Sequence, residues 1–361
     1  MFYMRLLMVL AVLSAGMLFG AADPALLKMR PEAVSAENVF RDPDYFNWCS
    51  SVIRGKDGRY HLIYSRWKRS LGFDAWLTHS TVAHAVADRP EGPYRYIGTL
   101  IDTEAPHYPV GAKITAHNPK IRYFDGRYYL YYISTRSERS LSDDELRQIA
   151  RIGDTRVPLR GELRRNQRTF VASAPAIEGP WTQSSLPLIE PSGPIETLTV
   201  NPAVVCGPDG RYYLIIKGDT PGSKTFRRNQ AVAVSDRPDC GFVMSPKPVI
   251  DDRDTEDISL WYDRDVRQFC AVYHAHTYIG LVLSENGRDW RFPDGGGKVL
   301  LKKEGIRRSD GGPTIHPNRL ERPFVYLEKG RAPVLSVAVM ERGDAFIVFI
   351  PFRPAATDRA Q

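Results

Sequence analysis

The chain has 361 residues and a formal net charge of +7, from 49 Lys and Arg against 42 Asp and Glu. The basic residues are dispersed rather than gathered in one block, and the sequence carries no nucleic-acid-binding motif, so we expect no nucleic-acid partner. The positive balance indicates either a solvated basic surface or a preference for an anionic ligand, such as a uronate-containing or sulfated glycan.

The first 22 residues are typical of a secretion signal. Arg5 precedes an apolar run from Leu6 to Phe19, and Gly20-Ala21-Ala22 forms a small-residue cleavage site. The apolar run is short for a membrane span, and no second run follows. The pattern predicts a signal peptide over residues 1–22 and an exported protein, periplasmic or extracellular, without a membrane span.

A turn motif then returns five times along the chain. Three copies read Asp-Gly-Arg-Tyr between runs of β-branched and aromatic residues, which is a strong hairpin signal because Gly supplies the positive φ of the turn. Two degenerate copies follow, and strand patterns after the turns give four strands per unit. The repeated arginines are Arg59, Arg127, Arg211, Arg267 and Arg331.

Five units of four strands predict an all-β fold, a five-bladed β-propeller of four-stranded antiparallel blades. Length alone would favour two domains, but the repeat predicts a single propeller domain over residues 23–361. The C-terminal strand Ala345–Ile350 should help to close the ring. Only the segment Ser137–Arg164 is additional to the repeated units, and we expect it to be an insertion on one rim of blade two. Ser142 followed by three acidic residues predicts a short helix within it.

The four cysteines lie in or beside predicted strands and show no metal-binding spacing. We expect buried thiols, although the predicted export permits one disulfide, for example between Cys206 and Cys240. The remaining two are Cys49 and Cys270.

The first strand of every blade lines the channel of a propeller, so equivalent positions on these strands should converge. Counting back about ten residues from each repeated arginine reaches Cys49 or Ser50, Asn118, Asn201, Asp257 and Glu321. Buried carboxylates are costly without a purpose, and hydrolysis of a glycosidic bond requires two of them. We therefore expect Asp257 and Glu321 at matched height on adjacent blades, with Glu256 on the opposite face of its strand.

The ends of the second strands should face the same rim and carry cations, an acid and imidazoles. Arg66, Lys217 and Arg322 are the cations best placed to meet an anionic substrate. Trp48, Trp67 and Trp76 could either stack on sugar rings or pack in the core. The predicted substrate-binding residues are Trp48, Arg66, Trp67, His79, His117, Asn118, Asn201, Lys217, Asp219, His274, His276 and Arg322.

His274 and His276 share one face of a strand because side chains alternate with period two. They could bind a structural divalent cation or hydrogen-bond a sugar. No further metal ligand is evident beside them, so the identity of any metal stays open and no cofactor is expected to be required.

The X-Pro strand starts, the Asp-Gly-Arg-Tyr-Tyr-Leu turns, Glu-Gly-Pro-Trp and Leu-Glu-Arg-Pro resemble the five-bladed propeller glycosidases of families 43 and 117, over residues 40–351. The resemblance implies a glycosidase acting on plant or algal polysaccharides or oligosaccharides, with acidic residues from several blades. Where family 43 has Asp in blade three, this chain has Asn201. We assign Glu321 as the acid, and Asp257 or an upstream acid, Asp42 or Asp44, as base or nucleophile.

Two other classes of protein fit parts of the pattern. A non-catalytic glycan-binding propeller would need aromatic and amide residues but no converging acids, so Asp257 and Glu321 count against it. A sialidase-like propeller carries repeated Asp-boxes, and only the segment from Ser284 to Trp290 is loosely similar to one.

Overall fold

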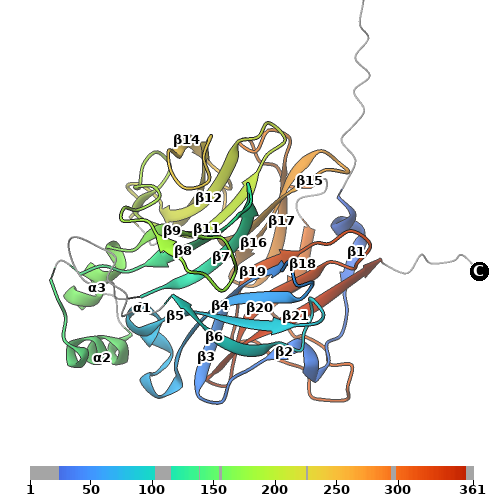
Figure 1. Ribbon diagram of the computed structural model, residues 1–361, viewed down its shortest axis with the longest axis horizontal. Helices are drawn as coiled ribbons and strands as arrows, with labels where there is room; N and C mark the ends of the chain where they lie inside the picture. Colours follow the sequence, from blue (N-terminus) through green and yellow to red (C-terminus); the bar gives the residue numbers. More distant parts are fainter. Residues whose placement is uncertain are drawn as a thin grey trace, which may run out of the picture.

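The computed structural model describes residues 24–101, 115–137, 139–153, 157–224, 227–293 and 298–354. The predicted signal peptide lies outside these residues and stays a prediction. The described chain forms five antiparallel sheets arranged around a centre, which confirms the predicted five-bladed β-propeller (Figure 1).

Blades 1 to 4 each contain four strands that follow one another in the sequence. Blade 1 comprises β3 (Tyr45–Arg54), β4 (Tyr60–Lys68), β5 (Thr81–Ala87) and β6 (Arg95–Ile101). Blade 2 comprises β7 (His117–Phe124), β8 (Arg127–Ser134), β9 (Arg168–Ala174) and β10 (Thr182–Gln183). Blade 3 comprises β11 (Glu196–Cys206), β12 (Tyr212–Asp219), β13 (Arg228–Ser235) and β14 (Val243–Pro248). Blade 4 comprises β15 (Glu256–Asp263), β16 (Gln268–Ala275), β17 (Tyr278–Ser284) and β18 (Lys298–Lys302).

Blade 5 joins the two ends of the described chain and so closes the ring. Its first three strands are β19 (Arg319–Tyr326), which is innermost, β20 (Val334–Glu341) and β21 (Asp344–Pro354). The short N-terminal strands β1 (Met29–Pro31) and β2 (Val39–Phe40) both pair with β21. The predicted C-terminal strand is therefore the third strand of this blade, and the N-terminal segment that covers its edge was not predicted.

The core of the protein lies between blades rather than within them. Buried apolar side chains form one cluster between each pair of neighbouring blades. Ile63 and Val82 of blade 1, for example, pack with Leu130 and Phe170 of blade 2. Because each sheet buries both faces against its neighbours, the ring holds the first strands around a common axis.

Every inner strand is interrupted by a β-bulge at one residue in the left-handed region. Register shifts mark these sites in all five blades. This conformation strains residues other than Gly by about 1–3 kcal/mol, and its recurrence shows that the surrounding ring enforces it. The bulged residues, with φ between 48° and 62°, are Cys49, Asn118, Asn201, Asp257 and Arg322.

The predicted insertion in blade 2 contains two helices, α2 (Asp143–Ile152) and α3 (Pro158–Arg165). Ser142 and Glu145 form a capping box at the start of α2, as the acidic sequence indicated. Leu163 of α3 packs with Ile149 of α2 and with Leu77 of the short helix α1 (Trp76–His79). These helices gather at one edge of the ring (Figure 1). Single-turn 3₁₀ helices at Ala25–Lys28, Ala36–Asn38, Arg69–Leu71 and Phe73–Ala75 complete the described elements.

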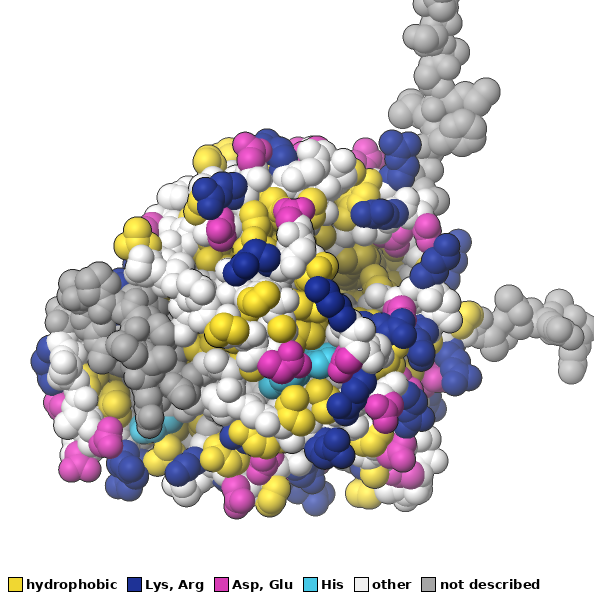
Figure 2. Space-filling model, in the orientation of Figure 1, with side chains coloured by type: hydrophobic (Ala, Val, Ile, Leu, Met, Phe, Trp, Pro, Cys, Tyr) yellow, Lys and Arg dark blue, Asp and Glu magenta, His cyan; other side chains and the backbone are white. Residues whose placement is uncertain are grey.

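All four cysteines are free thiols, so the disulfide that export would permit is not formed. Cys49 and Cys270 are buried as expected, whereas Cys206 and Cys240 are half-buried. No helix in the described ranges is long and apolar enough to cross a membrane. Lys and Arg side chains intermix with Asp and Glu over the face shown in Figure 2, in agreement with the dispersed charge of the sequence.

Candidate active site

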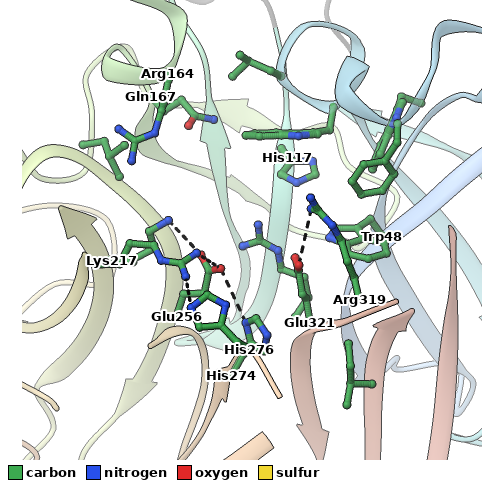
Figure 3. A pocket seen from close by; sticks show the side chains of 18 of the residues that line it. Trp48, His117, Arg164, Gln167, Lys217, Glu256, His274, His276, Arg319 and Glu321 are labelled. Atoms are coloured by element: carbon green, nitrogen blue, oxygen red, sulfur yellow. Dashed lines mark hydrogen bonds and ion pairs between the residues drawn. The ribbon is translucent and has the colours of Figure 1, made fainter. Parts of the chain in front are cut away.

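A pocket of about 440 Å³ opens at the centre of the ring and is lined by side chains from all five blades and from α3. One wall is aromatic, with Trp48, Trp67, Phe73 and Trp76, and much of the remainder is basic. Two acidic side chains line the pocket, Glu256 and Glu321. Figure 3 shows both glutamates entering the pocket.

The bulges divide the inner-strand residues into two layers. The residue before each bulge reaches the pocket in four blades, namely Trp48, His117, Glu256 and Glu321. The bulged residues lie one layer deeper, and only Arg322 among them also lines the pocket. The bulge thus places two polar layers at the centre of the ring, and the upper layer faces the pocket.

The deeper layer is a chain of polar contacts across the channel. Asn118 Nδ2 donates to Asn201 Oδ1 at 2.9 Å, and Asn201 Nδ2 donates to Asp257 Oδ1 at 2.6 Å. Arg322 forms an ion pair with Asp257, and the buried Lys120 donates to Asn118 Oδ1 at 3.1 Å. Because these groups pair with one another across the channel, we interpret the layer as the structural floor of the pocket.

The prediction that Asp257 and Glu321 lie at matched height is wrong by one residue in blade 5. Glu321 matches Glu256, and Asp257 matches Arg322. Ten residues separate Asp257 from Arg267, but only nine separate Arg322 from Arg331, so a fixed interval misaligns the blades. The X-Pro pairs would have given the correct register, because Pro follows the bulged residue at Asn118-Pro119, Asn201-Pro202 and Arg322-Pro323.

Glu256 lies among cations at the start of β15. Its carboxylate accepts a hydrogen bond from Lys217 Nζ at 3.1 Å and pairs with Arg228, while His274 Nδ1 lies 3.8 Å away. Burial opposes ionisation of this carboxyl group, but the positive charges of Lys217 and Arg228 outweigh it and hold the pKa of Glu256 well below its usual range. Glu256 is therefore ionised at neutral pH.

Glu321 has the opposite electrostatic environment. Burial is the main cause that raises the pKa of Glu321, and the negative charge of Glu256 raises it further, although Arg322 and His274 oppose the shift. Its nearest ion-pair partner, Arg319, lies 3.7 Å away, beyond hydrogen-bond distance (Figure 3). Two glutamates in one pocket thus have pKa values shifted in opposite directions.

The two histidines that were predicted to act as a pair both line the pocket but have different partners. His276 Nε2 lies 2.8 Å from Asp254 Oδ2, at a half-exposed position. His274 is buried, and its Nδ1 has no hydrogen-bond partner among the described residues. His274, Glu256 and Asp257 each bring one ligand atom within 4.8 Å of the others, a spacing at which three ligands can share a metal ion.

The group fits a divalent cation poorly. Both of its carboxylates already have cationic partners, Glu256 with Lys217 and Arg228, and Asp257 with Arg322. A metal ion there would be repelled by three positive charges at close range. A structural cation near the histidines stays a prediction, and we derive no chemical step from it.

The aromatic wall combines packing and exposure. Trp48 and Trp67 are 2% and 1% exposed and pack against Phe73, so most of each ring belongs to the core. Trp76 is only half-buried and offers more of its surface to a ligand. His117 is hydrogen-bonded to Ser80 Oγ at 2.8 Å, and burial holds the pKa of His117 well below its usual range, so the imidazole is neutral.

Several predicted site residues lie outside the pocket lining. Arg66 is buried between the rings of Tyr45 and Tyr96, Asp44 is exposed at the approach to β3, and His79 ends α1. Asn118 and Asn201 belong to the deeper layer, and Asp42 does not line the pocket. Asp219 lies behind the wall, where it accepts two hydrogen bonds from Arg164 at 2.7 and 2.9 Å.

The sequence pattern missed most of the basic lining. Arg164 and Arg228 come from two copies of Arg-Arg-Asn-Gln, at residues 164–167 and 227–230, near the start of the third strand in blades 2 and 3. That repeat could have identified both segments as neighbours of the site. Arg160, Lys303 and Arg319 carry no comparable signal.

No family model and no curated protein matches the chain. Among solved structures it is similar to a family 117 glycoside hydrolase from the marine bacterium Zobellia galactanivorans, at 14% identity and a TM-score of 0.59, covering 91% of this chain and 90% of that one. It is also similar to the GH43_1 enzyme from Xanthomonas citri, at 15% identity and a TM-score of 0.60, covering 90% and 92%.

A third similar structure is an alpha-L-arabinofuranosidase from Lactobacillus brevis, at 12% identity and a TM-score of 0.56, covering 89% of this chain and 94% of that one. The fold is thus shared, over nearly the full length, with glycoside hydrolases of the two families that the sequence resembles. At these identities the similarity concerns the fold.

Proposed function

We propose that this five-bladed propeller is a glycoside hydrolase in which Glu321 is the general acid and Glu256 is the base or nucleophile. The observation that supports this most strongly is the pair of glutamates in one pocket, with the pKa of Glu321 raised and that of Glu256 lowered. Hydrolysis of a glycosidic bond needs one carboxyl group that keeps its proton and one that has lost it.

In the proposed reaction, Glu321 transfers its proton to the glycosidic oxygen as the bond from that oxygen to the anomeric carbon breaks. Glu256 then either accepts a proton from the water that attacks this carbon, or attacks the carbon itself before water releases the sugar. The first route inverts the anomeric configuration and the second retains it. Identifying the anomer of the first product by NMR distinguishes the two.

The surrounding residues have supporting roles in this proposal. Lys217 and Arg228 keep Glu256 ionised, and both lie within its ion-pair distance. Asp257 balances the charge of Arg322 beneath the pocket, so we no longer assign it as the base. Asp44 is exposed and outside the lining, and we do not retain it in the catalytic set.

The proposed substrate is a plant or algal polysaccharide or oligosaccharide. The aromatic wall supports this, because the apolar face of a sugar ring packs well on Trp76 and Phe73. The fold neighbours, which include an arabinofuranosidase and a marine family 117 enzyme, agree with it. Export to the periplasm or the medium is part of the same proposal and is based on the sequence of residues 1–22.

The test is a screen of aryl glycosides and of plant and algal oligosaccharides with the wild type, Glu256→Gln and Glu321→Gln. Each substitution removes a charge with little change of volume, and kcat should fall by a factor on the order of 10²–10⁴. Glu285→Gln, at an exposed position outside the pocket, is the matched control and should match the wild type. Binding of a glycan without turnover of any would favour the non-catalytic glycan-binding alternative.

A further inference from the structure

The pocket contains more cations than its acids can balance. Seven Lys and Arg side chains line it, and five of these have an acidic partner of their own among the described residues. The five pairs are Arg160 with Asp74, Arg164 with Asp219, Lys217 with Glu256, Arg228 with Asp254, and Arg322 with Asp257. The two remaining cations are Lys303 and Arg319.

Lys303 follows β18 and turns its ammonium group toward the neighbouring blade. Its Nζ donates to the backbone oxygen of Asn318 at 3.3 Å, and no described carboxylate lies within ion-pair distance of it. The preceding residue, Lys302, behaves differently, because it pairs with Glu304 at 3.6 Å and does not line the pocket. The charge of Lys303 is therefore directed to the pocket without compensation from the described chain.

Arg319 follows Asn318 at the start of β19 and, like Lys303, lines the pocket. Its guanidinium group sits 5.2 Å from the centre of the Phe73 ring, and its side chain is 49% exposed. Among the residues that the structure describes, its one ionic contact is the 3.7 Å approach to Glu321. The proposed reaction requires Glu321 to carry a proton. In that state Glu321 is neutral and no longer balances the positive charge of Arg319.

We propose that Arg319 and Lys303 form an anion subsite, and that the substrate is a glycan with a carboxylate or sulfate group placed next to the bond that is cleaved. The location beside Glu321 gives the subsite its role, so this inference rests on the proposed glycosidase function. The planar fork of Arg matches the paired oxygens of either group, and Lys adds a point charge. Arg66, Lys217 and Arg322, the cations favoured by the sequence, are already held by aromatic rings or acids.

An anion at this position would also assist the reaction. Its negative charge, close to Glu321, favours the protonated form of that carboxyl group and so keeps the acid ready for proton transfer. A neutral sugar would instead leave two uncompensated cations facing a desolvated ligand, which reduces binding. The subsite therefore favours anionic sugars in two ways: it strengthens their binding relative to neutral sugars, and a bound anion keeps Glu321 protonated.

The experiment measures binding of the full chain to a panel of immobilised polysaccharides. Polygalacturonate and alginate carry carboxylates, carrageenan and dextran sulfate carry sulfate esters, and arabinan, xylan and agarose are neutral. The wild type should bind at least one anionic polymer about tenfold more tightly than any neutral one, with weaker binding at higher salt. Whether the carboxylated or the sulfated polymers are preferred identifies the group.

Arg319→Met and Lys303→Met should each weaken that binding about tenfold, since each removes one charged contact. Arg319→Lys keeps the charge but not the fork, and should lie between Arg319→Met and the wild type. Lys302→Met is the matched control, because it removes the same charge one residue away, and it should bind as the wild type does. Preference for a neutral polymer, or equal losses in Lys302→Met and Lys303→Met, would overturn the subsite.

Release of reducing ends in the same samples separates this inference from the proposed function. If an anionic polymer binds in a way that depends on Arg319 but no polymer is cleaved, the anion subsite is supported and the proposed glycosidase function is contradicted. If a neutral glycan is cleaved and Arg319→Met does not change the rate, the glycosidase function is supported and the anion subsite is contradicted.

Discussion

Lys217 donates a hydrogen bond from Nζ to Oε2 of Glu256 over 3.1 Å, and this contact joins blade 3 to blade 4 at the pocket. The positive charge of Lys217 is one of the main causes of the lowered pKa of Glu256, together with that of Arg228. The ionised state of the proposed base is thus set by a neighbouring blade.

The first prediction concerns the pH dependence of kcat/KM. The acidic limb should reflect ionisation of Glu256, and the alkaline limb should reflect loss of the proton from Glu321. Lys217→Met removes a charge that favours the carboxylate, so the pKa of Glu256 should rise and the acidic limb should move to higher pH by about one unit or more. Lys302→Met should leave the limb in place. A limb that stays fixed in Lys217→Met, or moves to lower pH, would exclude Glu256 as the group responsible.

The second prediction separates structural from catalytic carboxylates. Asp257→Asn leaves the mostly buried Arg322 without its charge partner, and the free energy of unfolding should fall by about 3–5 kcal/mol. The double variant Asp257→Leu with Arg322→Met should recover part of this loss, because no unpaired charge remains. Urea denaturation measures both effects, with Glu304→Gln as the exposed control. If Asp257→Asn is as stable as the wild type but inactive, Asp257 is a catalytic residue and not a structural one.

The third prediction concerns the insertion that carries part of the basic wall. Arg164 of α3 makes two hydrogen bonds to Asp219 at the end of β12, and both side chains are mostly buried. Asp219→Asn should weaken this connection by about 1–3 kcal/mol, so that amide hydrogens in α3 exchange faster and KM rises more than kcat falls. Asp236→Asn, which removes the exposed partner of Arg211, should change neither quantity. Unchanged exchange in α3 would show that the contact does not hold the insertion in place.

The fourth prediction concerns closure of the ring by β1. Met29 and Pro31 lie opposite Pro354 and Phe352 on β21, so a chain that begins after Pro31 would expose part of the edge of blade 5. Its melting temperature should be lower than that of a chain that begins at Asp23, and it should aggregate more readily on heating. Equal melting temperatures for the two chains would mean that β1 contributes nothing to closure.

The fold followed from the sequence because its signal is repeated and local. Gly58, Gly126 and Gly210 all adopt the positive φ that the Asp-Gly hairpins require, so each copy of the turn motif identifies a turn by itself. The strand β1 has only three residues and no alternation of apolar and polar positions, and its partner lies more than 300 positions away. Pairing of that kind depends on the closed ring and leaves no pattern in the sequence.

The site was predicted less well because it depends on single residues. The fixed ten-residue interval placed Glu321 in one layer with Asp257, but the bulges leave Glu321 beside Glu256 in the pocket and put Asp257 below it. The predicted site residues that do line the pocket are Trp48, Trp67, His117, Lys217, His274, His276, Glu321 and Arg322. The cations Arg160, Lys303 and Arg319 come from an insertion, a loop and a strand start, and only the closed propeller brings them together.

The most direct test of the assigned roles is the dependence of rate on the leaving group in Glu321→Gln and Glu256→Gln. A dinitrophenyl glycoside needs no protonation to leave, whereas a methyl glycoside does, so loss of the acid should matter only for the second. Glu321→Gln should keep most of its activity on the dinitrophenyl substrate and lose it on the methyl substrate, and Glu256→Gln should be impaired on both. The reverse pattern, with selective rescue of Glu256→Gln by the dinitrophenyl group, would contradict the assignment of Glu321 as the acid.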